Sequence, residues 1–93
     1  LDLSHFDVQN VIDMEEMFRQ CTSLESITFG ENFKTSSVTN MRYMFYTCSS
    51  LLSLDLSSFQ PTNVITMESM FSKCSSLKSI NLSSFNTCNF LFL

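Results

Sequence analysis

The sequence contains no alanine and no tryptophan, and only one glycine, one proline and one histidine among 93 residues. The scarcity of glycine and proline excludes collagen-like, linker-like and proline-rich chains. No apolar run reaches the roughly 18 residues that a membrane span requires, so we expect no span in this chain. The first ten residues also lack the basic start and apolar centre of a signal peptide. Five Lys and Arg against nine Asp and Glu give a net charge of −4, which predicts no nucleic-acid surface.

Large apolar and hydroxyl residues are plentiful instead. Leu, Ile, Val and Phe number 29, and Ser and Thr number 25. So many large apolar residues exclude intrinsic disorder, and the length fits a single small domain. The chain begins with Leu and starts and stops inside a repeating unit. We therefore expect a fragment of a longer protein.

Three segments of the chain align almost column for column and define a repeat. The first, second and third units are residues 1–26, 27–53 and 54–79, and residues 80–93 begin a fourth. One extra residue near Gly30 lengthens the second unit. The shared apolar columns are Phe6/Phe33/Phe59/Phe85, Val11/Val38/Val64, Met14/Met41/Met67, Phe18/Phe45/Phe71, Cys21/Cys48/Cys74 and Leu24/Leu51/Leu77. Matches at so many positions predict a repeat protein.

Each unit has two halves with different hydrophobic periods. One half alternates apolar and polar residues, which is the strand period. The other half places apolar residues at offsets 0, 3, 6, 7 and 10, which is the helix period. Asp13, Asn40 and Thr66 directly precede the predicted helices and are good helix N-caps. The predicted strands are residues 24–29, 51–56 and 77–82, and the predicted short helices are residues 14–21, 41–48 and 67–74.

A unit of this kind cannot bury its apolar face alone, and stacking several units solves the problem. The predicted fold class is an α/β repeat solenoid, a leucine-rich-repeat-like right-handed stack of about three and a half rungs. Parallel strands would pair about 4.8 Å apart, whereas helices prefer about 8–10 Å between axes. This mismatch predicts a curved stack, with the short strands on the concave face and the helices on the opposite side.

Residues 54–79, LDLSSFQPTNVITMESMFSKCSSLKS, resemble the repeat of the BspA-like leucine-rich-repeat surface proteins. The resemblance covers residues 1 to about 89. It implies a solenoid that is displayed at the cell surface or secreted, with a role in adhesion to host proteins or other cells and no catalysis. Gly30-Glu31-Asn32 and the terminal residues 90–93 depart from the family pattern. The resemblance names no specific ligand.

The candidate chemistry of the chain is limited. Cys21, Cys48 and Cys74 would form a ladder facing the core, for which a reduced packed ladder, a disulfide and a metal site are the alternatives. Cys88 lies outside this column and is the better candidate for a reactive thiol. A catalytic triad can be written from His5, Asp7 and almost any of 17 serines. Because so many serines would complete it, this triad is not evidence for catalysis. We therefore predict no enzyme activity, no cofactor and no metal.

The candidate binding surface is the outward strand column, because concave solenoid faces commonly bind partners. Its members are Asp2, Thr28, Asp55 and Asn81, with Ser53 and Ser79 beside them. Tyr43 and Tyr46 form a secondary candidate, since paired tyrosines are common at interfaces. The leading interpretation is a non-catalytic interaction or adhesion module, whose partners are a macromolecular surface or matrix protein and the neighbouring repeats of the full-length protein. The alternative is a passive spacer whose polar sheet face is merely solvated.

The two ends of the stack are also predicted from the sequence. Solenoids need polar terminal caps, yet Leu1 and Leu3 open the stack and residues 90–93, Phe-Leu-Phe-Leu, close it. We therefore expect the isolated chain to be marginally stable and to associate end to end.

Overall fold

The structure is a computed structural model that describes residues 1–85. Its regular elements are the strands β1 (Ser53–Asp55) and β2 (Ser79–Asn81) and the short 3₁₀ helices η1 (Pro61–Asn63) and η2 (Ser83–Phe85). Much of the remaining chain between residues 1 and 85 runs in turns. Cys88 and residues 90–93, for which the sequence predicts a reactive thiol and an apolar end, lie outside the described residues.

The two strands pair in parallel and in the register of the sequence repeat. Ser53 pairs with Ser79, and Asp55 pairs with Asn81. A separate, isolated parallel bridge joins Asp2 to Thr28. β1 and β2 lie within the strands predicted for the second and third units, whereas the strand predicted at 24–29 is reduced to this one bridge.

The helices predicted at residues 14–21, 41–48 and 67–74 are wrong, because no α-helix occurs among residues 1–85. Each segment is instead a series of turns, and in the first two segments the backbone N–H groups alternate between two kinds of acceptor. Phe18 N donates to Met44 O of the next unit at 2.8 Å. The neighbouring Met17 N donates locally to Met14 O at 3.3 Å. In each of these two segments, four of the seven backbone bonds therefore join units instead of closing helical turns.

Backbone conformation explains why no helix forms in these segments. Two residues in each segment, four positions apart, have a left-handed φ between 53° and 62°. They are Glu16, Gln20, Tyr43, Thr47, Ser69 and Lys73. A right-handed helix cannot pass through such residues. A turn every four residues still brings the same apolar columns inward. The spacing of apolar residues in the sequence therefore fits a series of turns as well as a helix.

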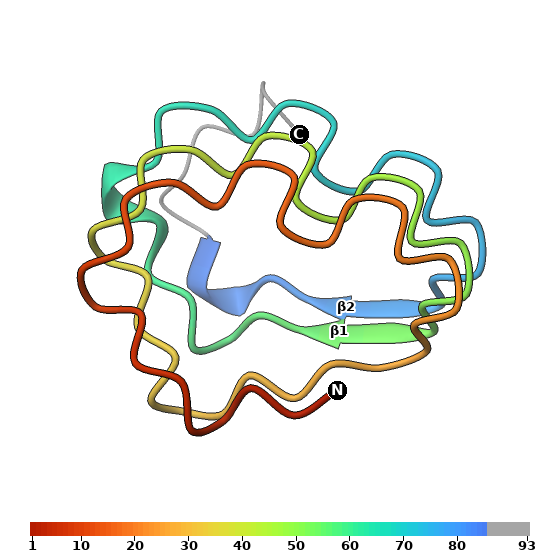
Figure 1. Ribbon diagram of the computed structural model, residues 1–93, viewed down its shortest axis with the longest axis horizontal. Helices are drawn as coiled ribbons and strands as arrows, with labels where there is room; N and C mark the ends of the chain where they lie inside the picture. The colour runs from red at the N-terminus through yellow and green to blue at the C-terminus, as the bar shows by residue number, and fades with distance from the viewer. Residues whose placement is uncertain (86–93) are drawn as a thin grey trace.

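The chain runs in successive circuits, each with its strand residues on one side (the strand side) and its turn segment on the other (the turn side). The core lies between these two sides (Figure 1). Phe18 stacks on Phe45 with ring centroids 5.4 Å apart, and Phe45 stacks on Phe71 at 5.8 Å. Equivalent side chains therefore lie above one another in successive units. Because the turn segments bond to each other directly, the wider helix spacing that predicted a concave strand face is absent.

The extra residue of the second unit lies where its chain passes over the first. Gly30 has φ +77°, and a Cβ at this position would lie 2.9 Å from the Ser4 Cβ. Only glycine meets both the conformational and the steric requirement. The single glycine of the chain thus lies where the second unit passes close to Ser4 of the first.

Candidate functional site

Three of the four residues in the outward strand column bind their own backbone. Asp2, Asp55 and Asn81 are exposed. The Oδ1 atom of each accepts a hydrogen bond, at 2.9 to 3.0 Å, from the backbone N–H two residues further on. These Asx turns bend the chain as it leaves the strand side. The polar character of the column therefore has a structural explanation at three of its positions.

The Asx turns also affect the acidity of the two carboxyl groups. The hydroxyl and backbone N–H of Ser4 lower the pKa of Asp2. Ser57 lowers the pKa of Asp55 in the same way. Both groups hydrogen-bond to the charged form of the carboxylate, so both aspartates stay ionised at neutral pH.

Two members of the column, Thr28 and Asp55, border a hollow of about 590 Å³. The complete lining is Ile27, Thr28, Phe29, Gly30, Glu31, Lys34, Asp55, Ser57 and Ser58. Of the six predicted strand-side residues, the structure brings only Thr28 and Asp55 together at this hollow. Ser53 and Ser79 pair across β1 and β2 and are exposed.

Two charged residues of the hollow, Glu31 and Lys34, were missed in the sequence analysis. Neither makes an ion pair or side-chain hydrogen bond with another described residue. The available signal was the extra residue of the second unit, which marks a local departure from the repeat. Both charges are free to meet a ligand entering the hollow.

Tyr43 and Tyr46 lie together on the turn side and are half-buried. Their rings meet edge to face with centroids 5.2 Å apart. Arg42 lies 4.5 Å from the Tyr43 centroid, and Arg19 and Lys73 lie 5.2 and 5.5 Å from the Tyr46 centroid. Cations at these distances are attracted to the ring faces. We call these five residues the tyrosine patch.

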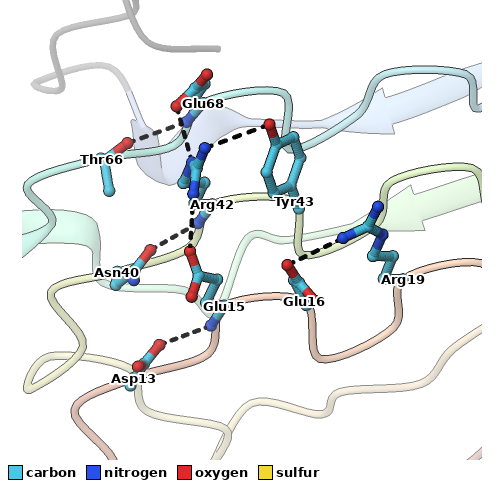
Figure 2. A network of polar contacts seen from close by, with 9 residues as sticks. All are labelled: Asp13, Glu15, Glu16, Arg19, Asn40, Arg42, Tyr43, Thr66 and Glu68. Carbon is cyan, nitrogen blue, oxygen red and sulfur yellow. Dashed lines mark hydrogen bonds and ion pairs between the residues drawn. The ribbon is translucent and has the colours of Figure 1, made fainter.

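Arg42 holds the tyrosine patch to all three units (Figure 2). It donates to Glu68 Oε2 from Nε at 2.8 Å, to Glu15 Oε1 from Nη1 at 3.3 Å and to Tyr43 Oη from Nη2 at 3.3 Å. Its hydrogen bond to Glu68 is the main cause of a raised pKa for Arg42. The guanidinium is therefore held in position by three hydrogen bonds.

Each of the three predicted N-cap residues hydrogen-bonds to the backbone of one residue of this network. Asp13 and Asn40 each accept, through Oδ1, a hydrogen bond from the backbone N–H two residues further on, and Thr66 does so through Oγ1 (Figure 2). The distances are 2.8, 3.0 and 3.3 Å respectively. These are the bonds expected of caps, but a turn follows each of them instead of a helix.

The three cations of the tyrosine patch were not predicted from the sequence. The alignment contained a signal for Arg42, because its column reads Glu15, Arg42 and Glu68 in successive units. Alternating charges in adjacent rungs are the pattern that opposite-charge cross-strand pairing produces. The same alignment places Arg19 in the Tyr46 column, which accounts for their contact.

The three cysteines of the ladder are free thiols. Cys48 Sγ donates to Phe18 O at 3.0 Å, and Cys74 Sγ donates to Phe45 O at 3.1 Å, so each thiol bonds the preceding unit. Burial raises the pKa of Cys48 to about 11 and also raises the pKa of Cys74. Neutral thiols are poor nucleophiles and poor metal ligands. Within residues 1–85, no three His, Cys, Asp or Glu side chains gather as a metal site.

The chain belongs to the family described as "Mycoplasma protein of unknown function, DUF285", whose sequence profile matches residues 1–91. Neither the curated proteins nor the solved structures contain a match to the chain. No helix among the described residues has the length and apolar character needed to cross a bilayer.

Proposed function

We propose that this chain is a non-catalytic protein-interaction module, of the adhesion type, within a cell-surface or secreted repeat protein. Its architecture under this proposal is a leucine-rich-repeat-like solenoid in which stacked turns replace the helices. The in-register pairing of β1 with β2 and the resemblance of residues 54–79 to the BspA-like repeat support this architecture. The surface location rests on that resemblance.

The observation that carries the interaction role is the tyrosine patch. Tyr and Arg are enriched among the residues that contribute most to binding at protein interfaces. Tyr43 and Arg42 are already fixed by a hydrogen bond and by ring contacts, so binding a partner costs little ordering entropy. Tyr43 and Tyr46 remain half-exposed and can therefore contact a macromolecular partner.

The spacer alternative also has a specific observation in its favour. Asp2, Asp55 and Asn81 are occupied by turns of their own backbone. In a passive spacer, the polar side chains of the strand side need only form these turns and contact water. Replacing Asp55 or Asn81 by Lys would break these turns, so Thr28 is the position where the strand side can be tested cleanly.

The test uses residues from equivalent positions in the third unit. Ser69 and Ser72 occupy the columns of Tyr43 and Tyr46, so the double variant Tyr43→Ser/Tyr46→Ser imports serines that the repeat already accepts. We expect binding to immobilised extracellular-matrix proteins and to cultured epithelial cells to weaken about 30-fold or more, since one hot-spot residue contributes roughly 2 kcal/mol or more. Circular dichroism of the variant checks that it is folded.

A second variant, Thr28→Lys, serves as the matched control on the opposite side of the molecule. If binding depends on the tyrosine patch, Thr28→Lys binds as the unmodified chain does. Loss of binding in Thr28→Lys alone would move the site to the hollow. Absence of binding by the unmodified chain, or equal binding by all three proteins, would contradict the proposed site and favour the spacer.

A further inference from the structure

Parallel pairing on the strand side closes the first and the last junctions between successive units in residues 1–85. At the first junction, Leu3 N donates to Thr28 O and Thr28 N donates to Leu1 O, both at 2.8 Å. At the last junction β1 pairs with β2, and Leu56 N donates to Asn81 O at 3.1 Å. Leu3 and Leu56 occupy one column of the repeat, and Thr28 and Asn81 occupy another. The two junctions therefore share one ladder pattern.

The middle junction, between the second and third units, lacks this pattern. The repeat places the equivalent bonds from Phe29 N to Asp55 O and from Asp55 N to Ile27 O, but neither bond is formed. Successive residues of a paired strand bond to opposite sides. Because Leu56 bonds to the fourth unit, its neighbour Asp55 faces the second. Two N–H groups and two carbonyl groups at this opening therefore have no backbone partner among the described residues.

The hollow of about 590 Å³ lies at this opening, because all three residues with missing bonds belong to its lining. The two segments of chain that border the hollow are joined on both sides of it. Before it, Leu52 N donates to Glu25 O at 3.1 Å. After it, Gln60 N donates to Thr35 Oγ1 at 2.8 Å. The opening is therefore a bounded gap in the ladder, and it lies inside the chain, away from both ends.

The side chains around the hollow add charge to these backbone groups. Glu31 is exposed and Lys34 is half-buried, and both belong to the lining together with Asp55. Neither Glu31 nor Lys34 makes an ion pair with another described residue. Two carboxylates against one ammonium group give the hollow a net negative charge. A ligand that carries a basic group therefore has the complementary charge.

We propose that this hollow binds an extended peptide segment that carries a basic side chain, as a site separate from the tyrosine patch. An extended main chain offers both N–H and C=O groups, so it can bond the donors of Phe29 and Asp55 and the acceptors of Ile27 and Asp55. A simple anion can match only the donors, and a metal ion can match only the acceptors. A Lys or Arg of the peptide pairs with Glu31. The site does not depend on the adhesive role proposed for the tyrosine patch.

Amide hydrogen exchange measured by NMR tests the opening in the free chain. Leu3, Phe29 and Leu56 occupy one column, and only the N–H of Phe29 lacks a bond across a junction. We expect the amides of Phe29 and Asp55 to exchange about 10-fold faster than those of Leu3 and Leu56. Adding the pentapeptide acetyl-Thr-Lys-Thr-Lys-Thr-amide should slow exchange at Phe29 and Asp55 and leave Leu3 and Leu56 unchanged.

Titration with altered peptides tests what is recognised. The same pentapeptide with N-methylated peptide groups cannot donate main-chain hydrogen bonds, so its binding should weaken about 10-fold or more. Replacing its lysines by glutamates should weaken binding to a similar degree. In the protein, Glu31→Gln should weaken binding of the lysine peptide about 3-fold or more, as expected for loss of one charge pair. Glu25→Gln is the matched control, because Glu25 is an exposed glutamate outside the lining.

The outcomes separate this site from the tyrosine patch. Tyr43→Ser/Tyr46→Ser should bind the lysine peptide as the unmodified chain does, whether or not that variant loses adhesion. Amides of Phe29 and Asp55 that exchange as slowly as that of Leu56 in the free chain would show a closed ladder and overturn the proposal. Absence of peptide binding, or equal binding of the N-methylated peptide, would overturn it as well.

Discussion

At the scale of single residues, the molecule depends on a few positions where only one side chain fits. Gly30 is the clearest, since it combines a left-handed φ of +77° with close contact to Ser4. Sequence alignment showed that the second unit had an extra residue there. It could not show that the crossing backbone leaves no room for a Cβ, because that contact joins two units.

We predict that Gly30→Ala lowers the free energy of unfolding by about 2–4 kcal/mol, since a left-handed alanine costs about 1–2 kcal/mol and the Cβ clash adds a similar amount. Urea unfolding followed by circular dichroism measures the change. The added variant Ser4→Gly removes the Cβ that lies 2.9 Å from the new methyl group and should recover part of the loss. Equal stability of Gly30→Ala and the unmodified chain would contradict the crossing geometry.

At the scale of elements, two of the three strands and most of the inward columns could be predicted from the sequence, whereas the turns that stand in place of the predicted helices could not. Leu54 alternates with exposed neighbours in β1 as the strand period requires. Met14 and Phe18 face inward as the helix period requires, but four-residue turns satisfy that spacing equally well. The choice between them depends on hydrogen bonds to another unit, such as that from Phe18 N to Met44 O. Local patterns carry no information about such bonds.

In the candidate sites too, contacts between near neighbours in the chain could be predicted from the sequence, whereas contacts between units could not. Tyr43 and Tyr46 could be paired from sequence because they are near neighbours in the chain. Arg42 and Glu68 meet across 26 positions, and their contact follows only when the units are stacked in register. The sequence could not separate binding from a structural role in the strand column, because the Asx turns at Asp55 and Asn81 account for the same polar pattern.

The turn segments make a testable prediction at Gln20, which has φ 60° and an exposed side chain. Gln20→Gly should raise the free energy of unfolding by roughly 0.5–1 kcal/mol, because relief of the left-handed strain exceeds the entropic cost of glycine. Gln20→Val should lower it by about 1 kcal/mol or more, since β-branched residues tolerate this conformation least. Thermal and urea unfolding compare the two. A valine variant as stable as the glycine variant would exclude the left-handed turn.

At the scale of the whole molecule, the buried thiols predict how stability depends on pH. The pKa of Cys48 is raised to about 11 in the folded chain, against about 8.5 for an unfolded cysteine. The unfolded state therefore releases its proton first as the pH rises. Stability is fully present below about pH 8.5 and is progressively lost up to about pH 11.

Urea unfolding at pH 7, 9 and 10.5 measures this loss, with Cys48→Ala as the control. The alanine variant is expected to be less stable at pH 7 but to lose less stability between pH 9 and 10.5. In the unmodified chain, Cys48 should react slowly with thiol reagents until the protein unfolds. Identical pH profiles for both proteins, or a disulfide between Cys48 and Cys74 in non-reducing mass mapping, would refute this account.

The hydrogen bonds between the turn segments of successive units also govern how the chain reaches its structure. The bonds that join turn segments link residues 25 or 26 positions apart, so none of them forms until a loop of that size has closed. Closing such loops is slow compared with forming a helix, whose contacts are local. A single unit emerging from the ribosome has almost nothing to fold onto. The smallest possible nucleus is a pair of units, which means that about two units must be synthesised before structure begins.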